Sequence, residues 1–319
     1  MNTNTNSNAN LPSVSDGLVL LSLNISIFDK SVKDKEIEED IMIQKGAHST
    51  AAASVYKPLF VNSPIFKAFK TLRGQARVWI NKPTAPFDDN GWRVTNVERY
   101  LSLNNEYPIY EGKFNALKAQ LEKEYLNEIS KQAFERGKLF DRNEYPSLDA
   151  IMGKFSIGLS VRPFPQKGHV LVDINNEVQK DLAAVVERQI NASVRSAMAD
   201  VWDKLRAHVE RVTERVTAVM EHDPNAVEEI KEFNEDGSLK SVEIKKKRRP
   251  KLHDSMLDDG LELCEVLKDL NFTNDPALEE ARAALQKALV RIDIDTLKED
   301  KSMQEATRKA MQDIADKFF

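Results

Sequence analysis

One stretch of this sequence restricts its folding more than any other, because its apolar residues recur at alternating intervals of four and three positions. From Met198 onward the apolar positions are Trp202, Leu205, Val209, Val212, Val216 and Val219. This spacing is a heptad seam over about three heptads, and such a seam is typical of a helix that packs along another helix. The chain is therefore expected to contain at least one extended helix–helix contact.

The helix that carries the seam is expected to be long. Val178, Leu182 and Val185 continue the pattern upstream in a shifted register, and Pro224 lies just beyond its end. A helix from about Asn176 to Glu221 would measure on the order of 70 Å, at 1.5 Å per residue. No compact domain needs a helix of that length unless a second helix lies along it.

Two kinds of occupant for the seam remain open at this point. A second copy of the chain, or a helix of another protein, would make the seam an interface and the protein oligomeric or partner-binding. The C-terminal helices of the same chain would instead make it part of an intramolecular core. The candidate interface residues are Trp202, Leu205, Val209, Val212 and Val216.

The first half of the chain carries shorter patterns that predict a small α+β domain over residues 17–174. Apolar residues alternate with smaller or polar ones in two segments, Val19 to Ile27 and Phe155 to Val161, which predicts two strands with one buried face each. Helices are expected from Pro64, with Ser63 as its cap, to Gly74, and from Glu111 to Lys138. Asp29 to Glu39 is expected to be a connection, and Gly168 to Asp173 a further strand.

The second half, residues 175–319, is expected to be a helical region with a β-hairpin arm at residues 228–245. Three helices should follow the arm, beginning near Asp254, at Pro276 after the cap Asp275, and at the capping box Ser302 to Glu305. The predicted fold class is α+β and mostly helical. A small N-terminal sheet-plus-helix domain precedes a long coiled-coil-like helix and a C-terminal helical region.

Composition narrows the class of protein. The net charge of −5 argues against a surface coated with cations for nucleic acid, and 11 glycines are few for an all-β sandwich or a glycine-looped nucleotide enzyme. The asparagine-rich start, residues 1–16, is expected to be disordered. No run approaches the roughly 18 apolar residues that span a bilayer. We therefore expect no membrane contact and a place in the cytoplasm of a bacterial host cell.

Catalytic and metal-binding patterns are missing from the sequence. It has no P-loop, no dinucleotide-binding glycine motif and no nucleophile elbow, and its five histidines lie in unrelated segments. Cys264, the single cysteine, is expected to be a small core residue. Asp293-Ile-Asp295 begins like a calcium loop but has Lys298 and Gln304 at two essential positions, so we interpret it as a helix-capping linker. No cofactor, metal or enzymatic activity is predicted.

A basic run is the strongest local signal. Its cations are Lys245, Lys246, Lys247, Arg248, Arg249 and Lys251, which lie close together in an acidic chain. Clustered cations release counterions from a phosphate backbone, and this mechanism needs no contact with bases. The run is thus a candidate nucleic-acid site, with a solvated loop that balances the acidic stretch Glu228 to Glu243 and a nuclear-import-like signal as the alternatives.

Arg77, Trp79, Trp92 and Arg93 form the second candidate nucleic-acid site. We expect them on two short strands around a turn-rich loop, as a β-hairpin or lid. Aromatic and cationic side chains on one hairpin could stack on unpaired bases. The alternative is that the tryptophans close the core of the small α+β domain.

The first 165 residues resemble an uncharacterised protein family that bacteriophages and large plasmids carry. The resemblance rests on Leu21-x-Leu23-x-Ile25-x-Ile27-Phe28, on Phe66-Lys-Ala-Phe-Lys-Thr-Leu-Arg73 and on Lys154-Phe-Ser-Ile-Gly-Leu-Ser-Val-Arg162. It implies a mobile-element context, an accessory or assembly role, and a ring-forming ATPase as a partner. Together these observations predict a non-catalytic binding or assembly protein. The alternative is a protein that binds single-stranded DNA or RNA in phage DNA metabolism.

Overall fold

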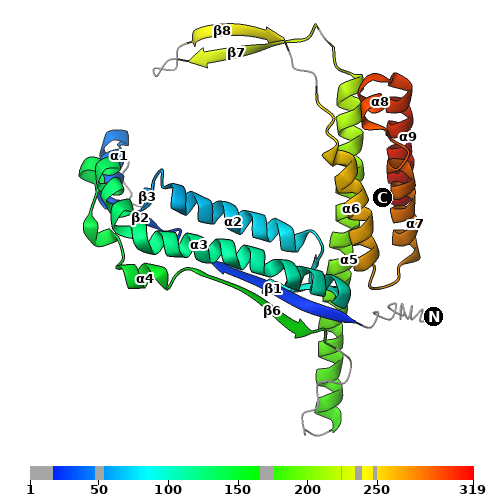
Figure 1. The fold of residues 1–319 in the computed structure, drawn as a ribbon, viewed down its shortest axis with the longest axis horizontal. Coiled ribbons are helices and arrows are strands. Elements are labelled where there is room, and N and C mark those ends of the chain that lie inside the picture. Colours follow the sequence, from blue (N-terminus) through cyan, green and yellow to red (C-terminus); the bar gives the residue numbers. More distant parts are fainter. Residues whose placement is uncertain (1–16, 47–53, 166–175, 224, 234–238, 247–249) are drawn as a thin grey trace, which may run out of the picture.

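The computed structural model describes residues 17–46, 54–165, 176–223, 225–233, 239–246 and 250–319 (Figure 1). Within these residues the chain is α+β and mostly helical, which confirms the predicted fold class. A small antiparallel sheet with two helices on it forms the N-terminal part, and the long helix α5 (Asn176–Met220) begins a helical bundle. A β-hairpin follows α5 and stands clear of both parts.

The sheet has four antiparallel strands in the order β4-β5-β1-β6. Their bounds are β4 Ala85–Pro86, β5 Arg93–Asn96, β1 Leu18–Ser26 and β6 Ser156–Pro163. The central strand β1 pairs with β5 along its first half and with β6 along almost its whole length. The two strands that the alternating patterns predicted, β1 and β6, are thus neighbours in one sheet.

Two helices, α2 (Pro64–Asn81) and α3 (Val97–Arg136), cover one face of this sheet. Leu21 of β1 packs there with Ile80 of α2 and Leu103 of α3. A second cluster, rich in aromatic side chains, holds the other ends of the two helices together and includes Phe66, Phe69, Phe114, Tyr125 and Phe155. The short N-terminal elements are β2 Ser31–Lys33, α1 Lys35–Lys45, β3 Tyr56–Pro58, η1 Gly137–Leu139, η2 Arg142–Glu144 and α4 Leu148–Met152.

The bundle consists of α5 and four further helices. Their bounds are α6 Ser255–Leu270, α7 Pro276–Leu289, α8 Ile294–Glu299 and α9 Lys301–Phe318. Helix α5 packs mainly along α9 and also against α6 and α7. Asp275 caps α7 and Asp293 caps α8, each by accepting hydrogen bonds from main-chain N–H groups of the first turn, as the sequence predicted.

The other face of the sheet packs on the bundle. Leu20 of β1 and Val94 of β5 belong to the same buried cluster as Val201 and Leu205 of α5. The first half of β1 is therefore buried on both faces, with Leu20 toward the bundle and Leu21 toward α2 and α3. The alternating pattern predicted one buried face, and the second is buried because the helical region covers it.

Polar contacts complete this joint. Lys204 of α5 donates from Nζ to the main-chain oxygens of Thr84, at 2.6 Å, and Asn81, at 3.1 Å. The Asn81 carbonyl lies at the C-terminal end of α2, where the helix dipole favours a cation. Arg99 of α3 forms an ion pair with Asp269 of α6. The predicted domains 17–174 and 175–319 thus meet through an apolar core with charged contacts at its edge.

Several local predictions were wrong. Gly74 does not end α2, which continues to Asn81 because Ala76 and Ile80 extend its buried stripe. Helix α3 begins at Val97, well before the predicted start. The expected connection Asp29 to Glu39 contains β2 and the start of α1. The cap of α9 is Asp300, which accepts a hydrogen bond from Ser302 N at 2.8 Å.

The expected disorder of residues 1–16 and the expected strand Gly168 to Asp173 lie outside the described residues. Among the helices that the structure describes, none combines the length and the apolar character needed to cross a membrane.

Candidate interaction site on the hairpin arm

The arm is the hairpin of β7 (Val227–Phe233) and β8 (Leu239–Lys246), and it confirms the hairpin expected at residues 228–245. Its strands run antiparallel, from Val227 opposite Lys246 to Phe233 opposite Leu239. In Figure 1 the arm, drawn in yellow, lies well away from the sheet and the bundle. An isolated two-stranded hairpin is at best marginally stable in water, so an arm of this kind gains from being covered.

The two faces of the arm differ in chemistry. Among the side chains of the arm that the structure describes, four apolar ones share one face by register and are about half exposed: Val227 54%, Leu239 52%, Val242 44% and Ile244 66%. The opposite face, called the polar face below, carries Glu232, Ser241, Glu243 and Lys245, and Ile230 takes the register position opposite Glu243. Ser241 Oγ donates to Glu232 Oε2 at 3.3 Å, and Lys245 Nζ lies 2.9 Å from Glu243 Oε2. The apolar face also carries Glu229, opposite Ile244, and Lys246, opposite Val227, so a partner on it would meet charges beside the apolar side chains.

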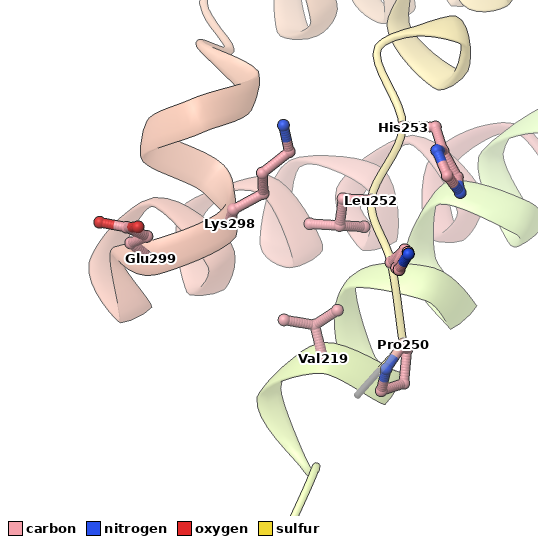
Figure 2. A pocket seen from close by; sticks show the side chains of 7 residues that line it. Val219, Pro250, Leu252, His253, Lys298 and Glu299 are labelled. Atoms are coloured by element: carbon pink, nitrogen blue, oxygen red, sulfur yellow. The ribbon is translucent and has the colours of Figure 1, made fainter. Parts of the chain in front are cut away.

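A cavity of about 580 Å³ lies at the base of the arm, beside the segment that returns from β8 to the bundle (Figure 2). Its lining comes from the end of α5, from residues 250–253 and from α8. Figure 2 shows Val219 and Leu252 between Lys298 on one side and His253 on the other. Val219 and Leu252 are buried, so the cavity has an apolar floor and a polar rim.

The lining of this cavity includes Lys251, Lys298 and Glu299, and Lys298 also lies near two carboxylates outside the lining. Lys298 Nζ lies 2.9 Å from Asp295 and 3.8 Å from Asp254, and the hydrogen bond to Asp295 raises the pKa of Lys298. Lys251 is exposed at the rim, and Lys246 is exposed at the end of β8. An apolar floor beside exposed ammonium groups can hold a partner's side chain or an anionic group.

The basic run is only partly described. Lys245, Lys246 and Lys251 are exposed, and Lys245 pairs with Glu243 of its own strand. The other three cations of the run, Lys247, Arg248 and Arg249, lie outside the described residues. Three of the six predicted contacts therefore have a defined place, at the base of the arm.

The heptad seam is not available as an interface in this structure. Leu205, Val212 and Val216 are fully buried and Val209 is 1% exposed, all within the core that α5 shares with the other bundle helices and the sheet. Trp202 is half-buried, donates from Nε1 to Asp275 at 3.3 Å, and meets the ring of Phe319 edge-on. In this structure the seam packs inside its own chain, as in the intramolecular alternative, because the C-terminal helices supply the apolar surface that the 4-3 spacing requires.

The four residues of the expected 77–94 hairpin lie on different elements. Arg77 and Trp79 belong to α2, so the predicted strand there was wrong. Trp79 donates from Nε1 to Glu106 at 2.7 Å and lies against the ring of Tyr110. The helix persists past Gly74 because a single glycine costs only about 1 kcal/mol in a helix whose apolar stripe is buried.

Trp92 precedes β5, and the guanidinium of Arg162 lies 4.0 Å from its ring centre. Arg93 lies on β5 and donates to Thr84 Oγ1 at 2.6 Å and to the Thr84 carbonyl at 2.8 Å. Its pKa is lowered by burial. The structure therefore does not bring the two tryptophans together on one hairpin, and Arg93 acts in the joint between sheet and bundle.

The exposed apolar residues of the arm were missed as site residues, although the hairpin itself was predicted. The signal was present in β8, where Val242 and Ile244 alternate with Ser241, Glu243 and Lys245. The same alternation would mark a strand that packs on its own chain. Only the structure shows that the apolar face of this strand stays uncovered by the described residues.

The cysteine and the candidate metal-ligating side chains of the described residues do not form a functional site. Cys264 is buried, as expected, and burial raises the pKa of its thiol to about 11. Within the described ranges, no three His, Cys, Asp or Glu side chains gather as metal ligands would. Comparison with known proteins found no matching family model and no curated protein or solved structure with significant similarity.

Proposed function

We propose that this protein is a non-catalytic binding and assembly protein that holds a protein partner on the apolar face of its arm. The observation that carries the proposal is the set of four exposed apolar side chains on a hairpin that stands clear of the sheet and bundle. Covering each half-exposed side chain contributes on the order of 1 kcal/mol. A partner that covers all four therefore gains several kcal/mol before the cost of ordering the arm.

Two adjacent residues of β8 allow a matched test of this function. Val242→Lys places a charge on the apolar face, whereas Ser241→Lys places the same side chain on the polar face beside Glu232. Tagged wild type and Ser241→Lys should retain the same proteins from a bacterial extract, and Val242→Lys should lose them, as measured by quantitative mass spectrometry. Equal retention by the two variants would count against the arm as the binding surface.

Binding of nucleic acid at the base of the arm is a second candidate, favoured by the exposed side chain of Lys251 at the cavity and that of Lys246 at the end of β8. If the six cations of residues 245–251 neutralise about four to six phosphates, log affinity for single strands should fall against log salt with a slope of about −3 to −4. Replacing all six by Ser or Gln should abolish binding to every sequence, because phosphate contacts carry no base information.

Fluorescence anisotropy with single-stranded oligonucleotides at 50 to 300 mM salt measures this slope. Trp79→Phe is the control, because its indole already binds Glu106 and should contribute nothing to stacking on bases. No binding by wild type at the lowest salt, or unchanged binding by the six-fold variant, would remove the base of the arm as a nucleic-acid site and leave the arm's protein partner as the function.

The setting that we propose is the cytoplasm of a bacterial host cell that carries a phage or plasmid. The support is the resemblance of the first 165 residues to a family that such elements carry. A ring-forming ATPase is among the partners that this setting suggests. In that role the sheet and the bundle would form the structural support, and the arm would bind the other proteins of the assembly.

A further inference from the structure

We infer that the exposed side of α2 is a second binding surface of this protein, and that it binds the phosphate backbone of duplex DNA. Because this surface lies on α2 and not on the arm, it is independent of the proposed function. Helix α2 carries four cations and no acidic residue, for a net charge of +4, in a chain whose net charge is −5. The four cations are Lys67, Lys70, Arg73 and Arg77.

Three of these cations share one side of the helix with a glycine. At about 100° per residue, Lys67, Lys70, Gly74 and Arg77 fall within about 80° of one another around the helix axis. These four residues, called the basic face below, are all exposed. From the first to the last they span about 15 Å, at 1.5 Å per residue. Duplex DNA carries about nine phosphates over that length, so each cation has phosphates within reach.

One carboxylate lies beside the basic face. Asp29 lies 2.7 Å from Lys70 and 3.7 Å from Arg73, and its side chain is 45% exposed. Lys67 and Arg77 have no ion-pair partner among the residues that the structure describes. Four cations against this one carboxylate leave a net charge of +3. The negative charges on distant parts of the chain are screened beyond about 8 Å at physiological salt.

Acidic side chains that meet other parts of α2 or its C-terminal end bind their own partners. Glu106 of α3 accepts a hydrogen bond from Trp79 Nε1 at 2.7 Å. Lys82, which follows the last residue of α2, lies 2.5 Å from Glu262 and 3.7 Å from Asp259. These three carboxylates are therefore partly neutralised and subtract little from the charge of the basic face.

Gly74 leaves the backbone of the helix open to a close approach. A β-carbon at this position would meet nothing within 4 Å, so packing inside the protein does not require glycine here. Glycine destabilises a helix interior relative to alanine, and it is used where a ligand comes close to the backbone. Lys70 precedes Gly74 by four residues and Arg77 follows it by three, so both are its neighbours on the helix surface. A phosphate seated on Gly74 would thus have a cation on each side, and Arg77 can bind it bidentately.

The remaining side chains of α2 favour a duplex over other polyanions. Proteins hold unpaired strands by stacking bases on aromatic side chains, whereas Phe66 and Phe69 are buried here and Trp79 is bound to Glu106. An anionic membrane takes up the large apolar residues of a helix, and within α2, which the structure describes completely, Val78 is the exposed one. Contacts with phosphates alone carry no base information, so the binding should not depend on sequence.

Fluorescence anisotropy with a labelled DNA duplex of about 20 base pairs tests this surface. Non-specific binding of this kind has dissociation constants of about 1–100 μM. Three phosphate contacts predict a slope of about −2.7 in log affinity against log salt, so affinity should fall about 40-fold between 50 and 200 mM salt. Changing Lys67, Lys70 and Arg77 together to Gln should abolish the binding and its salt dependence.

Two matched controls separate the basic face from the charge of the whole chain. Changing the exposed lysines Lys287, Lys301 and Lys309 of the bundle to Gln removes the same three charges and should leave the affinity within about twofold of wild type. Gly74→Glu should weaken binding about tenfold or more. Gln75→Glu adds the same charge at the next exposed position, about 100° around the helix, and should weaken it less than about threefold. Circular dichroism checks that each variant keeps the fold.

Equal affinities of the two triple variants, or of Gly74→Glu and Gln75→Glu, would overturn the basic face as the site. Loss of duplex binding in the six-fold variant of residues 245–251, with full binding by the α2 triple variant, would assign the DNA to the base of the arm instead.

A wild type that does not bind the duplex at 50 mM salt would overturn DNA as the ligand. If the α2 triple variant then failed to bind anionic lipid vesicles, or lost acidic proteins from a nuclease-treated extract, that other polyanion would take its place. None of these outcomes decides the proposed function, because Val242→Lys should bind the duplex as wild type does while it loses the partners of the arm.

Discussion

His208 lies where α5 and α6 cross, and its surroundings keep it neutral. It is 4% exposed, and a β-carbon at Gly260 would come within 2.4 Å of its Nε2, so the crossing is tight enough to require glycine. Burial lowers the pKa of His208 to about 4, the positive charge of Arg211 adds to this effect, and Asp259 opposes it. The folded protein therefore binds a proton here far less readily than the unfolded chain does.

The sign of the resulting pH dependence is fixed. A histidine in the unfolded chain titrates near 6.5, so the unfolded state gains protons first as the pH falls. Stability from this residue is complete above about pH 6.5 and is lost between about 6.5 and 4. At pH 5 we expect the free energy of unfolding to be about 2 kcal/mol lower than at pH 7 on account of His208 alone.

His208→Gln tests this, because glutamine has no charge to gain. Urea unfolding followed by circular dichroism at pH 7 and pH 5 should show a pH effect about 2 kcal/mol smaller in the variant than in wild type. His253→Gln, at an exposed histidine near the arm, should behave as wild type. The same pH effect in wild type and His208→Gln would assign it to other groups.

For single residues, the sequence predicted those properties that depend on neighbouring positions in the chain. Cys264 was placed in the core from the apolar residues around it on one helix, and this is confirmed. The contact between His208 and Gly260 was not predictable from the sequence. It joins α5 to α6, which the residues of the arm separate along the chain, and no local pattern marks it.

Elements whose sequence carries caps and uninterrupted spacing were predicted well. Helix α5 ends within one residue of its predicted limit, and Asp275 with Pro276 marks the start of α7. Helix α3 was predicted to begin at Glu111 because its apolar spacing was recognised only from Phe114 onward, yet the helix begins after the cap Asn96 and runs through Pro108. Tertiary packing of residues such as Leu103 holds that first part in place.

The cap Asp275 carries a testable contribution to the bundle. Its Oδ1 accepts from Ala277 N at 2.9 Å, and its Oδ2 accepts from Trp202 Nε1 at 3.3 Å. Asp275→Ala removes these bonds and the one from Leu278 N at 3.5 Å, and should cost about 1–2 kcal/mol of stability. Thermal unfolding measured by Trp202 fluorescence, in a chain with the other two tryptophans changed to Phe, reports the loss.

Asp275→Asn is the matched control, because asparagine caps a helix about as well as aspartate does. It should recover most of the stability lost in the alanine variant. If Asn were as costly as Ala, the charge of Asp275 at the helix N-terminus, rather than its hydrogen bonds, would be the stabilising feature.

At the scale of the whole molecule, the sheet and the bundle share a core. The sequence predicted two regions, 17–174 and 175–319, and in the described residues β6 ends at Pro163 and α5 begins at Asn176. It could not show that Leu20 of the first region packs with Val201 and Leu205 of the second. An apolar seam has the same spacing whether its partner lies in the same chain or in another, so the occupant of the α5 seam could not be decided from spacing.

We therefore expect the two regions to unfold together. Leu20→Ala should cost about 2–5 kcal/mol, and it should lower the urea midpoint equally for a probe in each region. Trp79 reports on α2 and Trp202 on the bundle, in variants that keep one tryptophan each.

Ile25→Ala, on the part of β1 away from the shared core, is the comparison and should cost less, since Ile25 is only partly buried. Two separate transitions in Leu20→Ala, with only the Trp79 signal shifted, would show that the sheet and the bundle are energetically independent.

The pairing of Val227 with Lys246 has a consequence for how this molecule can change over evolutionary time. The chain enters and leaves the arm at points one strand spacing apart, about 5 Å. Because its two ends are adjacent, the arm can be lengthened, shortened, exchanged or lost while α5 and α6 keep their packing. The sheet and the bundle can thus stay unchanged in evolution while substitutions in the arm alone adapt the protein to a new binding partner.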